Sequence, residues 1–115
     1  MKRVVYARRG GLEAIEIIDE ENPTPEDNQV RIEVHRAGIN FADLMMRQGL
    51  YGAAPDFPFT PGYEISGVVS EIGANVNDFS VGDRVVALPG FGGYVEQVVV
   101  DSNRVWPLPE NVSFD

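Results

Sequence analysis

Few residues of this sequence are of the types that carry out catalysis by themselves. The chain contains no cysteine and one histidine, His35. A catalytic zinc ion usually has three protein ligands drawn from histidine, cysteine and carboxylate side chains. A catalytic serine lies in a Gly-x-Ser-x-Gly turn and needs a histidine as base. The sequence offers neither arrangement, so thiolate chemistry and disulfide bonds are excluded, and His35 is interpreted as a solvated residue of a strand.

A glycine-rich segment at residues 90–93 is the next candidate, because glycine allows a ligand to approach the backbone closely. Its sequence, GFGG, lacks both the Gly-x-Gly-x-x-Gly spacing and the following helix that would bind a pyrophosphate. We therefore predict a structural turn. The alternative is a loop whose backbone a ligand approaches closely. The acidic run at 19–21 is predicted to be a solvated connector, and paired-carboxylate catalysis has no distinctive support.

Asn40 and the aromatic residues that follow it are the remaining candidates for a binding site. Asn40 is of a residue type that commonly caps a helix. A cap residue lies at an exposed helix end, so it can also contact a ligand. Tyr51, Phe57 and Phe59 lie in a segment with three prolines. These aromatics serve either in packing or as the rim of a binding cleft.

The elements that must position these residues are mostly short strands. Apolar and polar residues alternate strictly over residues 30–37, as in a strand with one buried face. Turn-forming Gly, Pro, Asp and Asn residues separate the strand-like segments. This pattern predicts a mainly β fold, either a barrel or a sandwich. The further predicted strands are residues 3–7, 13–18, 63–72, 84–87, 94–100 and 104–106.

One segment, residues 40–49, breaks the succession of strands and is predicted to be a short helix. It begins with Asn40 and has an acidic residue, Asp43, three positions later. Gly49 can end the helix in the left-handed conformation. The apolar positions that fall on one helical face are Phe41, Leu44 and Met45.

Composition and charge indicate a folded, acidic chain of 115 residues, of which 43% are hydrophobic and 23% are charged. The 9 basic and 18 acidic residues give a formal net charge of −9. Nucleic acids and anionic membrane surfaces are therefore unfavourable partners. No apolar run approaches the roughly 20 residues of a membrane-spanning helix. We expect a single cytoplasmic domain without an integral membrane segment.

Several motifs occur in an order characteristic of one superfamily. Residues 37–51 read AGINFADLMMRQGLY, and residues 61–69 read PGYEISGVV. They are followed by VGDRV at 81–85, GGYVE at 92–96 and PLPENVSFD at 107–115. Over nearly its whole length the chain resembles the N-terminal part of the medium-chain dehydrogenases/reductases. The resemblance implies a GroES-like, partly open β-barrel with one short helix.

The departures from the superfamily pattern are similar to those of the zinc-independent quinone oxidoreductases, in particular the branch of the vesicle amine transport protein homologues. Zinc alcohol dehydrogenases carry Cys at the position of Asn40 and His at the position of Tyr63. Their four-cysteine lobe has no counterpart here. The resemblance implies an enzyme that transfers a hydride from NADPH to a quinone or an enone without zinc.

The resemblance also implies roles for individual residues. Asn40 is expected to donate an amide hydrogen bond near the nicotinamide or the acceptor oxygen, as a catalytic and cofactor-binding residue. Tyr51, the second catalytic candidate, is expected to present its phenol to the substrate. Tyr63 and Met45 are the substrate-binding candidates, although the tyrosine that some quinone reductases carry at the position of Met45 is not carried over. Asp43 is expected to cap the helix.

The NADPH-binding Rossmann domain of the family has no counterpart in residues 1–115. The resemblance therefore implies that this chain is the N-terminal, GroES-like segment of the catalytic domain of a larger enzyme, which would form a homodimer. The segment alone is expected to be inactive and to self-associate. The alternatives are a free-standing GroES-like interaction module and a non-catalytic binding protein on the same fold.

Overall fold

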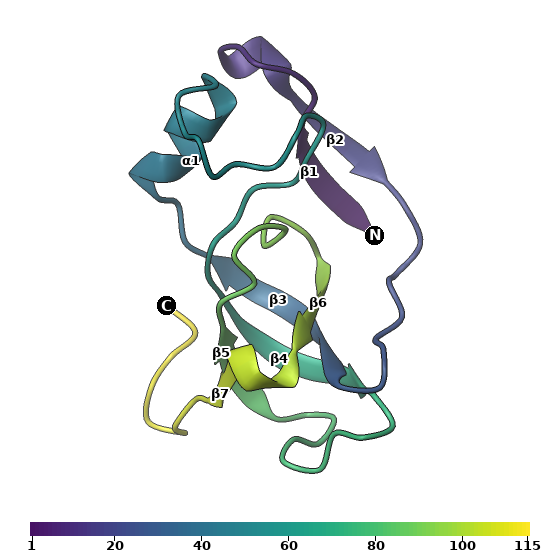
Figure 1. The fold of residues 1–115 in the computed structure, drawn as a ribbon. Helices are drawn as coiled ribbons and strands as arrows, with labels where there is room; N and C mark the ends of the chain where they lie inside the picture. Colours follow the sequence, from purple (N-terminus) through teal and green to yellow (C-terminus); the bar gives the residue numbers. More distant parts are fainter.

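Seven strands, one α-helix and two short 3-10 helices make up the structure of residues 1–115, a computed structural model (Figure 1). Five strands form one antiparallel sheet in the order β6-β3-β4-β5-β7, and β1 and β2 form a separate antiparallel pair. No helix of the protein has the length and hydropathy needed to cross a membrane. In chain order the elements are β1 (Lys2–Tyr6), η1 (Leu12–Ala14), β2 (Ile15–Asp19), β3 (Gln29–Ala37), α1 (Phe41–Arg47), β4 (Ile65–Ile72), β5 (Arg84–Ala87), β6 (Gln97–Asp101), η2 (Ser102–Arg104) and β7 (Val105–Pro107).

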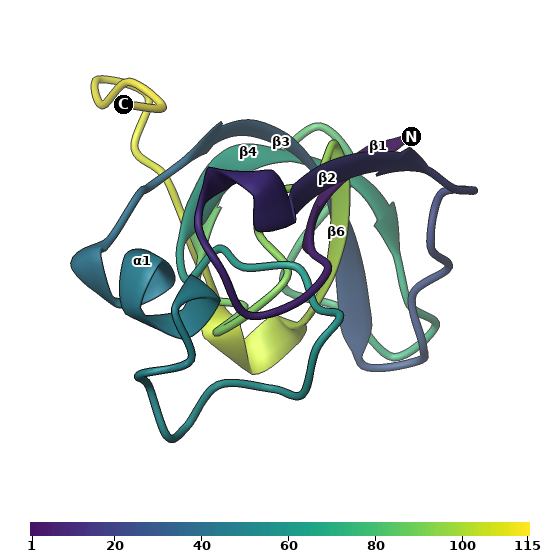
Figure 2. The ribbon, with the colours of Figure 1, turned by 90° about the horizontal axis from the view of Figure 1, so that it is seen from above.

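The β1–β2 pair is joined to the rest of the molecule through loop segments. The Val4 N–H donates to the Tyr94 carbonyl (2.9 Å). Tyr6 and Phe59 exchange two backbone hydrogen bonds of 2.8 and 3.2 Å. Viewed from above, the strands curve around the interior, and α1 lies to one side (Figure 2). The molecule is therefore mainly β, with open sheets and one helix, as predicted.

The main core lies on the inner face of the five-stranded sheet. Val30 and Ile32 of β3 are fully buried, whereas Glu33 and His35 are exposed, so the alternation predicted for β3 is confirmed. The buried residues of this core are Val30, Ile32, Ile65, Val69, Val76, Phe79, Val85, Ala87, Val98, Val100 and Val105.

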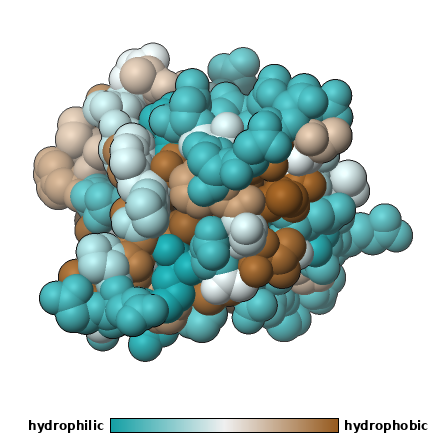
Figure 3. All heavy atoms as spheres, turned by 90° about the horizontal axis from the view of Figure 1, so that it is seen from below, coloured by the Kyte–Doolittle hydropathy of each residue, from teal (hydrophilic) through white to brown (hydrophobic).

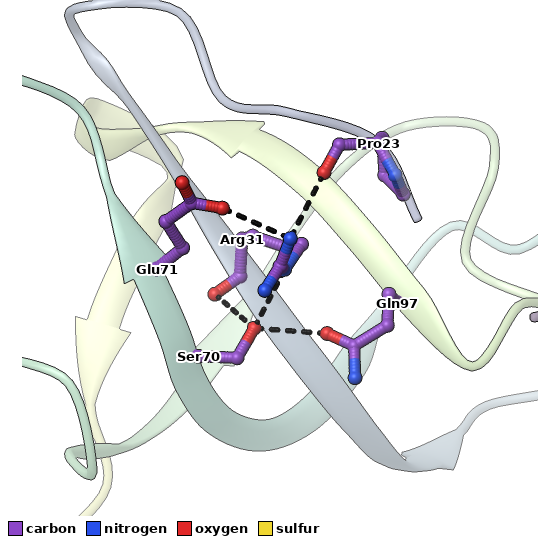
Figure 4. Close-up of polar contacts among 5 residues, drawn as sticks. All are labelled: Pro23, Arg31, Ser70, Glu71 and Gln97. Atoms are coloured by element: carbon purple, nitrogen blue, oxygen red, sulfur yellow. Dashed lines mark hydrogen bonds and ion pairs between the residues drawn. The ribbon is translucent and has the colours of Figure 1, made fainter. Parts of the chain in front are cut away.

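A bulge in β4 organises the polar outer face of the same sheet. At the register shift next to Arg31, Ser70 is an extra residue in β4. Arg31 Nε donates to Ser70 Oγ (3.0 Å), and its Nη1 lies 2.9 Å from Glu71 Oε2. Ser70 in turn donates to Gln97 Oε1 (2.8 Å), and Arg31 also donates to the Pro23 carbonyl (3.3 Å) (Figure 4). These contacts join β3, β4 and β6 to the connector before β3.

The C-terminal segment, residues 108–115, is fastened to the sheet by side chains. His35, the extra residue at the second register shift of the β3–β4 pair, stacks on Phe114 with ring centroids 4.3 Å apart. The Arg84 guanidinium of β5 lies over the same ring, 4.6 Å from its centroid. Arg84 also donates to three carbonyls of the segment: Pro109 (3.1 Å), Glu110 (3.4 Å) and Val112 (2.6 Å).

The helix α1 lies where it was predicted, but the apolar face noted in the sequence is not the face that is buried. Met46 is 3% exposed and Asp43 is 1% exposed, whereas Phe41 is 77% exposed and Leu44 is 39% exposed. Met46 packs in a second small cluster with Tyr6 and Phe59. This face of α1 can be buried because the Asp43 carboxylate accepts hydrogen bonds from the Asn40 N–H and the Tyr94 hydroxyl.

Several strands also begin or end at residues other than those predicted. Residues 13–14 belong to η1, because the Ala14 N–H donates to the Gly11 carbonyl (3.0 Å) and Glu13 Oε1 accepts from the Gly11 N–H (3.0 Å). Residues 63–64 and 94–96 precede β4 and β6. The carbonyls of 63 and 64 accept from loop N–H groups, whereas residues 94–96 form only an isolated bridge to β1. Residue 104 ends η2, and β7 extends to Pro107.

Candidate functional site

Asn40 is the N-cap residue of α1 and has an extended backbone (φ −116°, ψ 153°). Its backbone N–H donates to Asp43 Oδ2 (2.9 Å), in the arrangement of a capping box. The predicted capping roles of Asn40 and Asp43 are therefore confirmed. The Asn40 side-chain nitrogen, Nδ2, is buried and has no hydrogen-bond partner within the chain. It therefore lacks the hydrogen-bond partner that buried polar groups normally have.

Met45 and Tyr51 lie at the end of α1 and in the following loop. The Leu50 N–H donates to the Met45 carbonyl (2.9 Å), which turns the chain back at the helix end. Tyr51 is 41% exposed, and its hydroxyl makes no hydrogen bond within the chain. Phe59, by contrast, is buried, and Phe57 is half-buried against it. Of the three aromatics considered for packing or for a binding rim, Tyr51 alone is exposed.

Tyr63 lies on a segment that crosses the glycine-rich loop at residues 90–93. A Cβ atom on Gly62, which has φ +118°, would lie 2.5 Å from Gly93 Cα, so only glycine permits this crossing. The loop N–H groups donate to carbonyls of the crossing segment: Gly90 to Tyr63 (3.4 Å), Gly92 to Thr60 (2.8 Å) and Gly93 to Gly62 (3.1 Å). Because these donors are occupied, the loop is a structural turn, as predicted, rather than a phosphate cradle.

The fold brings Asn40 and Tyr63 into one region, whereas Tyr51 comes from another loop. The Gly38 N–H, two residues before Asn40, donates to the carbonyl of Glu64, which follows Tyr63 (3.1 Å). The Glu64 side chain lies over Gly38, where a Cβ would be 2.2 Å from Glu64 Oε1. No hydrogen bond links Tyr51 to either of the other two candidates.

Two hollows flank this region. One, of about 370 Å³, is lined by Gly38 and Glu64 and by Phe114 of the C-terminal segment. The other, of about 380 Å³, is mostly apolar and is lined by Ile39 and Tyr94 among others. The candidates Asn40, Met45, Tyr51 and Tyr63 do not themselves line these two hollows. A third, polar hollow of about 870 Å³ is lined by residues 26–29 and 101–103.

Asp43 lies beneath Asn40 with two tyrosines around it. The Tyr94 hydroxyl donates to Asp43 Oδ2 (2.5 Å). Burial, together with this hydrogen bond and the negative charge of Asp43, raises the pKa of Tyr94 well above its usual range. Burial and Asp43 also raise the pKa of Tyr6, an effect that Arg47 partly offsets. Neither tyrosine was among the candidates predicted from the sequence, where the position of Tyr94 directly after two glycines was the available signal.

The sequence matches the alcohol dehydrogenase GroES-like domain over residues 26–110. The chain therefore belongs to this family, and the predicted GroES-like fold is confirmed. The match includes β3, α1 and the segments that carry Asn40, Tyr51 and Tyr63.

Relatives and solved structures confirm the resemblance to the quinone oxidoreductases. Quinone oxidoreductase-like protein 2 from Bos taurus is 46% identical over 98 residues, which are 84% of this chain and 28% of that protein. The human synaptic vesicle membrane protein VAT-1 homolog-like protein superposes with a TM-score of 0.95 and 37% identity, over 99% of this chain and 36% of that one. Escherichia coli quinone oxidoreductase, in its complex with NADPH, gives a TM-score of 0.93 and 31% identity, over 99% and 35% of the two chains. The chain thus spans roughly a third of the length of these relatives or less.

Proposed function

We propose that the chain is the N-terminal, catalytic-domain part of an NADPH-dependent oxidoreductase that transfers a hydride to a quinone or an enone without zinc. The observation that carries this proposal is the unpaired, buried Nδ2 atom of Asn40 at the start of α1. It occurs in a chain that superposes over 99% of its length on a quinone oxidoreductase whose structure contains NADPH.

The residues of this region fit a nicotinamide or a carbonyl acceptor. A buried donor without a partner is uncommon in folded proteins, and an oxygen atom of a ligand would satisfy it. The glycine-rich loop does not fit a pyrophosphate, since its N–H groups are occupied by residues 60–63. We therefore place the phosphate-binding part of the site outside residues 1–115.

NADPH, when bound, supplies the hydride, and the acceptor oxygen gains negative charge as the hydride arrives. The Asn40 amide would donate a hydrogen bond to that oxygen and stabilise the developing charge. The free, exposed hydroxyl of Tyr51 would offer a second donor or a stacking surface. Tyr63 and Met45 would provide contacts that hold the acceptor close to the cofactor.

The donor set supports the absence of zinc from this mechanism. Asn40 and Tyr63 stand where zinc alcohol dehydrogenases carry Cys and His. The one histidine, His35, stacks on Phe114 at another part of the sheet, and no group of three His, Cys, Asp or Glu side chains is placed to hold a metal ion. Neither an amide nitrogen nor a phenol is among the usual zinc ligands.

One observation favours the alternative, an interaction module or a non-catalytic binding protein. The face of α1 that carries Phe41 and Leu44 is exposed, and an exposed apolar face is typical of a surface that contacts another molecule. The same face is also available to a cofactor domain in the enzyme. Measurement of activity separates the two interpretations.

The test is NADPH oxidation by the full-length protein with a series of quinones and enones. Asn40→Ala is expected to lower kcat/KM by about a hundredfold, as for the loss of one donor to a developing oxyanion. The melting temperature should also fall, because alanine keeps the backbone N–H that donates to Asp43 but removes the side chain that caps the helix, a loss of roughly 0.5–2 kcal/mol. Asn77→Ala, which truncates an exposed asparagine in a loop, is the matched control. A full-length protein that binds quinones or a protein partner without oxidising NADPH would support the alternative.

A further inference from the structure

The buried carboxylate of Asp43 has more contacts than a helix cap needs. Its Oδ2 atom accepts one hydrogen bond from the Asn40 N–H (2.9 Å) and another from the Tyr94 hydroxyl (2.5 Å). An exposed aspartate would cap the helix equally well, and burial of a carboxylate is unfavourable unless hydrogen bonds compensate for it. The side chain is nevertheless 1% exposed. The Tyr94 contact is thus what permits Asp43 to be buried directly beneath Asn40.

Tyr94 is itself held rigidly at the crossing of two loops. Its N–H donates to the Pro61 carbonyl (3.0 Å), and its carbonyl accepts from the Val4 N–H (2.9 Å). Its hydroxyl oxygen also lies 3.3 Å from the Gly38 carbonyl oxygen. Because burial and Asp43 raise the pKa of Tyr94, the phenol keeps its proton in neutral solution and remains a donor to the carboxylate.

The segment from Gly38 to Asn40 is consequently fixed at both of its ends. The Gly38 N–H donates to the Glu64 carbonyl (3.1 Å), and the Asn40 N–H donates to Asp43. The one polar group of Asn40 that these contacts leave without a partner is the side-chain nitrogen.

We propose that Asp43 and Tyr94 are positioning residues that hold the backbone of Asn40, so that its free amide faces the acceptor in one orientation. The proposal rests on the function proposed above for Asn40. Neither Asp43 nor Tyr94 touches the acceptor, and both act through the start of α1.

A double-mutant cycle in the full-length protein tests this coupling. Tyr94→Phe removes the donor to Asp43 and keeps the ring. It is expected to lower kcat for quinone reduction by about tenfold when Asn40 is present, since small displacements of a reacting group are costly. In the Asn40→Ala background it is expected to lower kcat no further, because the amide to be positioned is gone. Ser70→Ala, which removes a half-buried hydroxyl and its hydrogen bond to Gln97 on the outer face of the sheet, is the control for loss of a hydrogen bond and of stability.

Equal reductions by Tyr94→Phe in both backgrounds, or no reduction in either, would overturn the proposal and leave the function of Asn40 standing. A wild-type protein without NADPH-dependent activity would overturn the proposed function instead. The positioning is then tested by hydrogen exchange of the Asn40 backbone amide. The exchange rate should rise about tenfold in Tyr94→Phe, reflecting a more frequent local opening, and should be unchanged in Ser70→Ala. Unchanged protection in Tyr94→Phe would show that Tyr94 does not hold Asn40.

Discussion

Asn40 combines a backbone that starts a helix with a side chain that has no partner for its nitrogen. An unsatisfied buried donor costs about 1–3 kcal/mol, so its retention calls for an explanation. Two other buried atoms, Thr60 Oγ1 and Arg3 Nε, also lack partners. Asn40 differs from them in its place at a helix N-terminus, between two hollows whose linings include Gly38 and Ile39. This combination is the observation on which the proposed ligand contact of Asn40 rests.

Tyr51→Phe should separate a chemical role of Tyr51 from a packing role. The ring volume is kept, and the hydroxyl removed has no hydrogen bond within the chain, so the melting temperature should not change. If the hydroxyl contacts the acceptor, kcat/KM for quinone reduction by the full-length protein should fall about tenfold, equivalent to roughly 1.4 kcal/mol. Unchanged kinetics would show that Tyr51 contributes through its ring alone.

The raised pKa of Tyr94 predicts a loss of stability in alkaline solution. The folded protein holds the phenolic proton more tightly than the unfolded chain does. The corresponding stabilisation is therefore complete below the pKa of an unfolded tyrosine, and it decreases as the pH rises above that value. The free energy of unfolding in urea, measured across the alkaline range, should fall less steeply in Tyr94→Phe. Tyr6, whose pKa is also raised, should account for part of the remaining decrease. Identical slopes in the two proteins would contradict the assignment.

Among the elements, the β3–β4 pair is the most constrained. Gly67 of β4 faces β3 so closely that an added Cβ would lie 2.1 Å from the Glu33 carbonyl oxygen. Gly67→Ala must therefore displace the backbone of one strand, and it should lower the free energy of unfolding by about 1–3 kcal/mol or more. Gly52→Ala is the matched control, because no atom lies within 4 Å of its Cβ position. Urea denaturation should show an unchanged midpoint for the control, and an equally unchanged midpoint for Gly67→Ala would refute the close approach.

The strands and the helix could be predicted where local pattern determines them. The alternation of residues 30–37 marks β3, because one face of that strand packs in the core. The bulges at Ser70 and His35 could not be predicted, since they arise from the pairing of two distant strands. The orientation of α1 could not be predicted for a similar reason. Burial of Asp43 depends on Tyr94, which lies 51 residues further along the chain.

The candidate site could be predicted in part. Residue type and spacing identified Asn40 and Asp43 as a cap, because a capping box is a local arrangement. Which atom of Asn40 remains unpaired is a property of the folded molecule, as is the exposure of Tyr51 beside the buried Phe59. The family resemblance, rather than any pattern of spacing, supplied the role of Tyr63.

On the scale of the whole molecule, large apolar side chains are exposed over several elements. Apolar patches reach the surface between polar residues on the face shown in Figure 3. The most exposed large apolar residues are Ile39, Phe41, Leu12 and Ile17. Surfaces of this kind are typical of contacts with other protein segments.

Residues 1–115, isolated, are therefore expected to self-associate. The net charge of −9 opposes association at low ionic strength and is screened at high ionic strength. Sedimentation velocity should show a mass that rises with protein concentration, and more strongly in added salt. Phe41→Ser should weaken the association, because Phe41 is 77% exposed and contributes to the apolar face of α1. A monomer at every concentration and salt level would exclude this behaviour.

The contacts of the C-terminal segment, residues 108–115, determine how that segment would detach from the sheet. Strand β7 is held by a ladder with β5, whereas the residues after it are held by side chains. His35 stacks on the Phe114 ring, Ser66 donates to the Phe114 carbonyl, and Arg36 pairs with Asp115. The Arg84 guanidinium contacts three carbonyls and the Phe114 ring. Rotation of this one guanidinium would release several contacts at once while the sheet remained paired. Complete detachment of the segment also requires the loss of the contacts to His35, Ser66 and Arg36, and its free energy is separate from that of global unfolding. The end of the chain is thus clamped to β3, β4 and β5 at the same time, and a single substitution at Arg84 would loosen it without freeing it.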